Sequence, residues 1–259
     1  MAIPIIVMGV TGRMGSTIAA MAQSDPDFYL AGVVERPVCA EGMRGYTCTQ
    51  GTKLEDVLPG SDPNAVVIDF TAPQASVEAA ETATKHGHPI VIGTTGLNPG
   101  QQERLAKAAQ KAPVLWAPNM SVGINVLLKV LPELVRLLGE KYDMEMVELH
   151  HNQKKDAPSG TALKLAQVLA EARDWDLDEV GKYCREGIIG ARPRKEIGVQ
   201  TIRGGDVVGV HTVYFMGPGE RIEVTHQAHS RENFATGALR AAKWIGKQPA
   251  GFYSMADLL

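Results

Sequence analysis

The first half of the chain alternates short apolar runs with segments of helical spacing, and this alternation limits the possible folds more than any other feature. The first apolar run, 3-IPIIVM-8, leads through a glycine-containing turn into a helical pattern over 14–23. Further apolar runs cover 29–35, 65–70, 89–93 and 113–117, and further helical patterns cover 74–85 and 99–111. Repeated strand–helix units form right-handed crossovers, so the pattern predicts a mostly parallel sheet with helices on both faces.

The second half of the chain follows a different pattern. A helical segment over 122–138 leads into a strand-like run over 143–151, and another helix is expected to open at Ser159. Three longer strand-like runs follow, separated by a Gly-Gly pair and by GPG, as in an antiparallel meander. These runs cover 197–203, 206–216 and 220–228, and a last helical pattern covers 231–247.

Together these patterns predict an α/β fold class. We expect a Rossmann-like, doubly wound parallel sheet domain, followed by a C-terminal α+β domain with a mixed or antiparallel open sheet. The first domain would comprise residues 1–121 plus 231–259, because the last helix resembles those of the first half. The second domain would comprise residues 122–230.

Composition and charge exclude several classes of protein. The formal net charge is -3 and no dense Lys/Arg face stands out, which argues against nucleic acid as a partner. The three cysteines are widely spaced and form no CxxC pair, so neither a disulfide framework nor a Cys-rich metal site is expected. No apolar run reaches the ~18 residues of a membrane span, and the N-terminus lacks the basic region of a signal peptide. We therefore expect a soluble, cytoplasmic protein.

The turn after the first strand has the sequence 9-GVTGRMG-15, whose glycine spacing is one step off the usual G-x-G-x-x-G. Between a strand and a helix, backbone N–H groups and the helix dipole can hold a pyrophosphate. Glu35 ends the next strand, where an acid would accept hydrogen bonds from a ribose diol. The alternative is a tight turn whose glycines serve geometry alone. Arg36 could stack on the adenine, meet a 2′-phosphate or lie in solvent, so NADH and NADPH both stay open.

Three more loops follow predicted strands of the same parallel sheet. They are 69-DFTAP-73, 93-GTTG-96 and 117-APNMSVG-123. Each alone would pass for an ordinary turn. The carboxyl ends of parallel strands meet at one edge, where ligands bind in open α/β sheets, so the loops together favour a binding site.

The segment 148-ELHHNQKKDAPSGTALKLAQ-167 places protonatable groups directly before a helix. Ser159 is expected to cap this helix, and Gly160 lets a ligand approach its N-terminal N–H groups, which bind anions. His150, His151 and Lys154 add cationic or proton-donating groups. The combination suits an anionic substrate, such as a dicarboxylate, that must gain a proton.

Other interpretations of this segment remain open. A histidine here could be a packing or surface residue, and adjacent histidines on a strand point to opposite faces. Asp156 could simply pair with a lysine. Metal binding by His150 and His151 lacks the further ligands of a tetrahedral set, so no metal site is expected.

Residues 148–162 resemble the signature E-x-H-H-x-x-K-x-D-A-P-S-G-T-A of the dihydrodipicolinate reductase family, also called 4-hydroxy-tetrahydrodipicolinate reductases. The likeness covers nearly the whole chain, including 203-RGGDVVGVHTVYF-215 and 226-HQAHSRENFATGAL-239. It implies reduction of a cyclic imine dicarboxylate in lysine and diaminopimelate biosynthesis, with NADH or NADPH. It also implies a homotetramer joined through the sheet of the C-terminal domain, which would bind the substrate. No nucleic-acid or membrane partner is implied.

The resemblance assigns roles residue by residue. His150 and Lys154 match the proton-handling, catalytic positions. The positions that match substrate contacts are His151, Ser159, Gly160 and Thr161. The positions that match cofactor contacts are Gly9, Val10, Thr11, Gly12, Arg13, Met14, Glu35, Arg36, Gly93, Thr94, Thr95, Ala117, Pro118, Asn119 and Met120.

Two positions depart from the family pattern. Val210 stands where the family usually has the acid of G-E-H, and Ala72 stands where some members carry a basic residue. The absence of that basic residue weakens any expectation of strict NADPH preference. His211, His226 and His229 are expected to be strand or packing residues, with His226 the one that could approach the site.

Two other functions compete with the reductase. Another Rossmann-type NAD(P)-dependent dehydrogenase of amino-acid metabolism would explain residues 1–120 but not the segment from His150 to Thr161. A redox-sensing protein that binds NAD(P)H without turnover would have no need of proton donors at His150 and Lys154.

Overall fold

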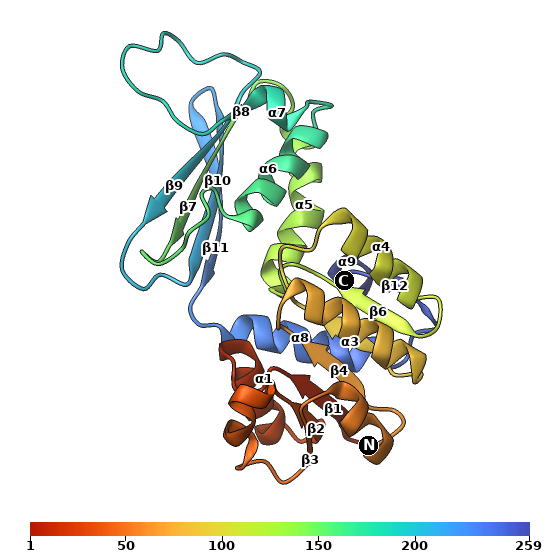
Figure 1. Cartoon of the computed structure of the whole chain (residues 1–259). Helices are drawn as coiled ribbons and strands as arrows, with labels where there is room; N and C mark the ends of the chain where they lie inside the picture. The colour runs from red at the N-terminus through yellow and green to blue at the C-terminus, as the bar shows by residue number, and fades with distance from the viewer. The chain divides into compact units, whose positions relative to one another are not determined.

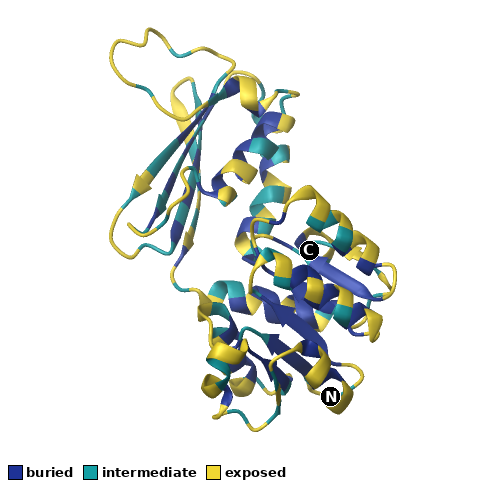
Figure 2. Cartoon of the chain, in the orientation of Figure 1, coloured by how far each residue is buried: buried dark blue, intermediate teal, exposed yellow.

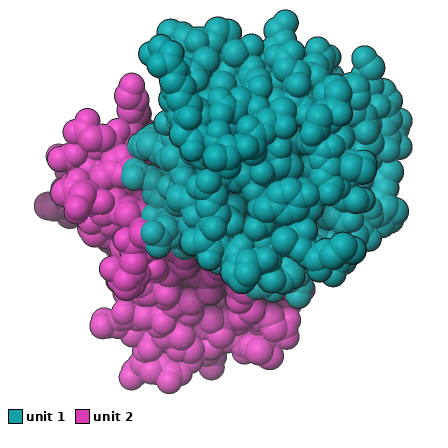
Figure 3. Space-filling model, turned by 90° about the horizontal axis from the view of Figure 1, so that it is seen from below, with its two compact units in different colours: residues 1–122, 231–259 teal, residues 123–230 magenta.

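The computed structural model describes all 259 residues, in two compact units (Figures 1 and 3). Unit 1 contains Met1–Val122 and Arg231–Leu259, and unit 2 contains Gly123–Ser230. No helix combines the length and the apolar character that crossing a membrane requires.

Unit 1 is built on one seven-stranded sheet in which every pair of neighbours is parallel. The strand order is β12-β6-β5-β4-β1-β2-β3. The strands are β1 (Ile3–Met8), β2 (Phe28–Val34), β3 (Thr49–Gly51), β4 (Val66–Asp69), β5 (Ile90–Ile92), β6 (Pro113–Trp116) and β12 (Gly251–Tyr253). The chain moves from β1 to β2 on one side and places β4 on the other, so a topological switch point lies between β1 and β4.

Helices cover both faces of this sheet, because alternate residues of each strand point to opposite faces. Ile5 and Val7 of β1 belong to a core with α1 and α8, whereas Ile6 belongs to a second core with α3 and α4. Figure 2 shows the strands buried and the outer sides of the helices exposed. The longer helices are α1 (Arg13–Ser24), α3 (Pro73–Lys85), α4 (Pro99–Ala108) and α8 (Glu232–Ile245). The short ones are η1 (Pro37–Met43), α2 (Leu54–Val57), η2 (Leu58–Gly60) and α9 (Met255–Leu258).

Unit 2 holds a five-stranded sheet of order β11-β10-β7-β9-β8. Its strands are β7 (Asp143–His150), β8 (Gly181–Lys182), β9 (Ile197–Arg203), β10 (Gly209–Gly217) and β11 (Glu220–Ala228). The helices of this half are α5 (Val122–Leu138), α6 (Gly160–Glu171) and α7 (Leu177–Val180). β10 pairs antiparallel with β7 and β11, while β9 pairs parallel with β7 and β8. A Rossmann-like parallel sheet domain and a second domain with a mixed sheet are therefore confirmed.

The predicted meander of three consecutive strands is wrong for its first member. β9 forms no hairpin with β10, because β7 lies between them. The Gly-Gly pair at 204–205 belongs instead to a loop that meets the end of β7: the Gly204 N–H donates to the His150 carbonyl at 3.0 Å. Local turn signals could not reveal a partner strand about fifty residues earlier in the chain.

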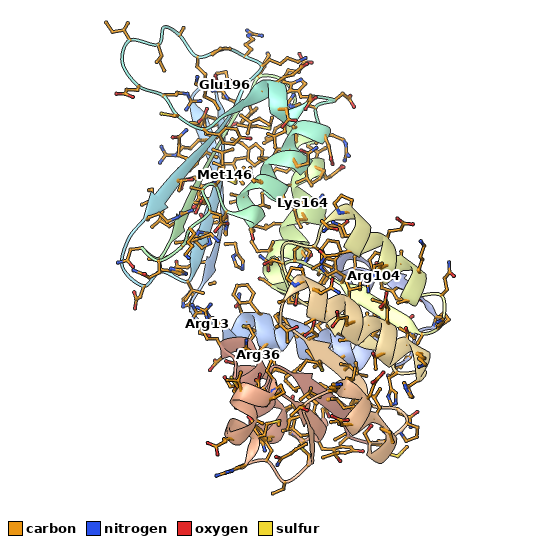
Figure 4. All side chains as sticks on the ribbon, in the orientation of Figure 1. Arg13, Arg36, Arg104, Met146, Lys164 and Glu196 are labelled. Carbon is orange, nitrogen blue, oxygen red and sulfur yellow. The ribbon has the colours of Figure 1, made fainter.

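The two faces of the unit 2 sheet differ. Met146 of β7 and Phe215 of β10 are buried on the face that packs against α5 and α6, and Figure 4 labels Met146 in this layer. On the other face, which we call the outer face, Val147, Leu149 and Val210 are only half-buried. The polar residues Glu148, His150 and His211 continue the helix-facing row toward the end of β7.

Candidate functional site

The glycine turn of unit 1 requires glycine at two positions for geometric reasons. Gly9 has φ +63, in the left-handed region that favours glycine. A Cβ on Gly15 would lie 2.2 Å from the Gly9 carbonyl oxygen, so only glycine lets α1 start this close to β1. Gly12 precedes α1 without a side-chain cap, which leaves the first N–H groups of the helix for a ligand.

Glu35 lies at the end of β2 with its carboxylate directed at this turn. It is 5% exposed and accepts hydrogen bonds from the Thr11 amide at 3.0 Å, the Thr11 hydroxyl at 2.6 Å and the Arg36 amide at 2.8 Å. Burial alone would raise the pKa of Glu35, but these hydrogen bonds outweigh it and lower the pKa. The turn therefore faces an ionised acceptor.

A cavity of about 660 Å³ opens beside the turn and is formed entirely by unit 1. Predicted cofactor residues that line it are Gly9, Thr11, Gly12, Glu35 and Arg36. Phe70 and Thr71 of the predicted edge loop 69–73 line it too, and so does Lys53, which was not predicted. The Arg36 side chain is 77% exposed, and Figure 4 labels it. The cavity thus combines the buried carboxylate of Glu35 with two cations, Arg36 and Lys53, and two exposed carboxylates, Glu55 and Glu78.

The other predicted cofactor residues do not line this cavity. Val10 is fully buried in a core, while Arg13 and Met14 open α1. The remaining residues follow the carboxyl ends of β5 and β6, at the same sheet edge as the glycine turn: Gly93, Thr94, Thr95, Ala117, Pro118, Asn119 and Met120. Packing requires glycine at position 93, because a Cβ there would lie 2.1 Å from the Phe70 ring.

The candidate site of unit 2 centres on Glu148, which is fully buried. Arg203 donates to both carboxylate oxygens, at 2.8 Å each. The oxygens also meet His150 Nδ1 at 2.6 Å, the Ser159 amide at 3.0 Å and the Thr201 hydroxyl at 3.2 Å. Burial would raise the pKa of Glu148, but hydrogen bonds from Arg203, His150 and Ser159 outweigh it and lower the pKa to about 2.

His150 packs against a second imidazole, that of His211 on β10. The ring centroids lie 5.2 Å apart at an interplanar angle of 74°. Burial lowers the pKa of His150, although Glu148 opposes this. Burial, assisted by the charge of His150, lowers the pKa of His211 to about 3, so His211 is neutral at pH 7. His211 Nε2 lies 3.2 Å from the Ser159 hydroxyl, which places this predicted packing residue inside the site.

The segment after β7 carries the other predicted residues. Lys154 Nζ lies 3.0 Å from Asp156 Oδ1, and Arg203 donates to the Asp156 carbonyl at 2.8 Å. The predicted cap of α6 is confirmed: the Ser159 hydroxyl accepts from the Ala162 amide at 3.1 Å. A Cβ on Gly160 would meet no atom within 4 Å, so the space over the helix N-terminus is open.

His151 and Thr161, the remaining predicted substrate contacts, flank this arrangement. The His151 amide donates to the Val207 carbonyl at 2.7 Å, and Thr161 is the second residue of α6. No three His, Cys, Asp or Glu side chains converge in a way that could hold a metal ion.

Comparison with known proteins places this geometry in a family. Residues 3–120 match the family model described as "Dihydrodipicolinate reductase, N-terminus", and residues 123–259 match the one described as "Dihydrodipicolinate reductase, C-terminus". The chain belongs to the dihydrodipicolinate reductase family.

Relatives support this membership over the full length. A protein of Nitratidesulfovibrio vulgaris (strain DP4) named 4-hydroxy-tetrahydrodipicolinate reductase is 65% identical over 259 residues, with 100% of both chains covered. One of the same name from Oleidesulfovibrio alaskensis is 64% identical over 260 residues, again with 100% of both covered. A solved dipicolinate-bound dihydrodipicolinate reductase from Paenisporosarcina sp. TG-14 has TM-score 0.80 and 26% identity, covering 100% of both chains. A probable dehydrogenase from Thermotoga maritima, at TM-score 0.61 and 14% identity, covering 99% of this chain and 92% of its own, shares the fold.

Membership in the dihydrodipicolinate reductase family gives the departure at Val210 a structural context. Val210 pairs with Leu149 on the outer face, whereas His211 points toward His150. The missing acid of the G-E-H pattern therefore belongs to the opposite side of the sheet from the His150 cluster.

Proposed function

We propose that this chain reduces the cyclic imine dicarboxylate dihydrodipicolinate, or 4-hydroxy-tetrahydrodipicolinate, to tetrahydrodipicolinate in lysine (diaminopimelate) biosynthesis. The observation that carries the proposal is one short segment of unit 2 that holds a buried imidazole, a lysine and an open helix N-terminus. These groups can neutralise a carboxylate and deliver a proton. Relatives of the same name that match from end to end support the choice of substrate.

Unit 1 is proposed as the dinucleotide-binding domain, for NADH or NADPH. The cavity fits this role, because the uncapped start of α1 suits a pyrophosphate and the ionised Glu35 suits a ribose diol. Arg36 and Lys53 could accept a 2′-phosphate at the same cavity, which supports use of either cofactor. The bound nicotinamide would supply the hydride.

Unit 2 is proposed as the substrate-binding and oligomerisation domain. The N–H groups of Gly160 and Thr161, with Ser159 and His151 nearby, would anchor a substrate carboxylate. Negative charge that develops on the ring nitrogen would be met by His150 and Lys154, one of which provides the proton.

A homotetramer in the cytoplasm completes the proposal. The outer face of the unit 2 sheet carries apolar side chains that are only half-buried, among them Val147, Leu149 and Val210. A face of this kind gains stability by pairing with another copy. Light scattering on the purified protein should give four chain masses. A monomer at micromolar concentration would refute this part.

A coupled assay tests the reaction. Freshly generated substrate is mixed with the protein and either NADH or NADPH, and cofactor oxidation is followed by absorbance. We expect turnover that requires the substrate, with both cofactors active. No turnover with this substrate, together with turnover of an amino-acid-pathway aldehyde, would favour another Rossmann-type dehydrogenase. Cofactor binding without any turnover would favour a sensor.

A further inference from the structure

Glu148 receives more hydrogen bonds than pairing with one arginine requires. Five donors converge on its two oxygens, in an unequal distribution. Oε1 receives the Ser159 amide, the Thr201 hydroxyl and one Arg203 nitrogen, while Oε2 receives the other Arg203 nitrogen and His150 Nδ1. A carboxylate has no donor of its own, so the Nδ1 that faces Oε2 must carry the imidazole proton.

The other nitrogen of His150, Nε2, lies on the edge of the ring that faces Gly209 of β10. A Cβ built on Gly209 would lie 3.0 Å from His150 Nε2 and 3.3 Å from Cδ2, so glycine at this position lets the imidazole lie close to the β10 backbone without a side chain against Nε2. Charged and titratable groups facing His150 are Glu148 on its own strand, Arg203 on β9, His211 on β10 and Lys154 in the following segment. Among these, Glu148 alone contacts Nδ1.

We propose that Glu148, held by Arg203, is a positioning residue that fixes the His150 imidazole with its proton on Nδ1 and directs Nε2 to the proton transfer of the reaction. This inference rests on the proposed function for its catalytic part, but the tautomer it assigns is a property of unit 2 alone. Arg203 also donates to the Asp156 carbonyl, and Asp156 pairs with Lys154. Arg203 thereby contacts both Glu148, which holds His150, and Asp156, which pairs with Lys154.

The variant Glu148→Gln separates this role from simple packing. The three donors at Oε1 would retain the amide oxygen on their side, which places the amide NH₂ against His150 Nδ1 and against the Arg203 nitrogen that donates to Oε2. An NH₂ group can only donate, so His150 would have to move its proton to Nε2. We expect kcat to fall by about 10- to 100-fold, up to the general-acid contribution of His150 itself, with a smaller change in KM.

Two measurements test the proposal. Nitrogen NMR of ¹⁵N-histidine-labelled protein at pH 8, with the His150 signal assigned from its absence in His150→Ala, should show the Nδ1–H form in the wild type. The same spectrum of Glu148→Gln should show the Nε2–H form. In addition, Glu148→Gln placed in the His150→Ala background should lower kcat by less than about 2-fold, because Glu148 acts through His150.

Glu145→Gln provides a matched control. Glu145 lies on the same strand, is similarly engaged by Arg185 at 2.6 and 2.9 Å and by Arg192 at 2.8 Å, and points to the outer face. It should leave kcat and the His150 signal unchanged.

An Nε2–H tautomer in the wild type would overturn the proposal even if Glu148→Gln did not fold. Unchanged kcat in Glu148→Gln, or a full additional loss of kcat in the double variant, would overturn it too. If the wild-type protein did not reduce the substrate, the proposed reaction would fail, while the NMR result would still decide whether Glu148 sets the tautomer.

Discussion

Replacing Arg203 by methionine would leave the Glu148 carboxylate as a buried anion without its main counter-charge. The guanidinium donates to both oxygens at 2.8 Å, and Glu148 is 0% exposed. Removing one partner of a buried pair costs about 3–5 kcal/mol. The lowering of the Glu148 pKa from 4.5 to about 2 corresponds to about 3 kcal/mol, a consistent figure. We therefore expect Arg203→Met to lower the free energy of unfolding by about 3–5 kcal/mol at pH 7.

The loss should depend on pH in a defined direction. In the wild type, the lowered pKa of Glu148 gives stability that is present above 4.5 and is lost as the pH falls toward about 2. In Arg203→Met, burial raises the pKa with less opposition, so Glu148 takes up its proton at a higher pH. The difference in stability between wild type and variant should consequently be largest at pH 7 and should shrink at pH 4.

Urea unfolding followed by tryptophan fluorescence measures this difference. Trp175 belongs to unit 2, so a reference background with Trp116→Phe and Trp244→Phe reports on that unit alone. Arg136→Met is the control, because Arg136 also lies in unit 2 and its pair with Glu133 has side chains 60% and 63% exposed, which should contribute no more than about 1 kcal/mol. If Arg203→Met at pH 7 cost no more than Arg136→Met, Glu148 would not depend on Arg203 as argued.

Three further predictions concern the two units. His150→Ala and Lys154→Ala should each lower kcat by about 10²-fold, the size of a general-acid contribution, while the exposed Lys155→Ala should not; near-normal kcat in both site variants would contradict their roles. Gly15→Ala should abolish NADH binding in a fluorescence titration, since its Cβ would lie 2.2 Å from a backbone oxygen of the turn; unchanged affinity would contradict the proposed pyrophosphate site. Burial lowers the pKa of His211 from 6.5 to about 3, so between these pH values the unfolded state binds more protons than the folded state. The free energy of unfolding of the wild type should therefore fall by up to about 1.4 kcal/mol per pH unit as the pH drops through this range. His211→Gln should remove the contribution of His211 to this pH dependence of the free energy of unfolding. An equally steep pH dependence in the variant would count against a buried neutral imidazole.

The parallel sheet of unit 1 could be predicted because its strands are buried on both faces. The run 3–8 is continuously apolar and the run 65–70 is apolar except for Asp69, and their boundaries agree with β1 and β4 to within one residue. Short elements such as β3, β12 and α2 were not predicted, because three or four residues carry too little periodicity. Strand pairing in unit 2 was also beyond local patterns, since β9 finds its partner in β7 rather than in the adjacent β10.

Within the site, local features were predictable and distant partners were not. The Ser159 cap follows from the residue types around it. Glu148 could have been found from strand alternation, because it lies two residues before His150 and must share its face. Arg203 gave no such signal: it lies 55 residues from Glu148 in sequence, and only the parallel register of β7 and β9, which sets His150 opposite Arg203, brings it to the carboxylate.

The same alternation explains how this chain can depart from its family at one position of a shared motif. Residues 209, 210 and 211 are consecutive, yet only Gly209 and His211 border the His150 ring. Val210 faces the other way, next to Leu149. A change there alters the half-buried outer face without removing any of the five donors that hold Glu148. The site can therefore stay fixed while the opposite face, proposed to join the copies, varies in polarity.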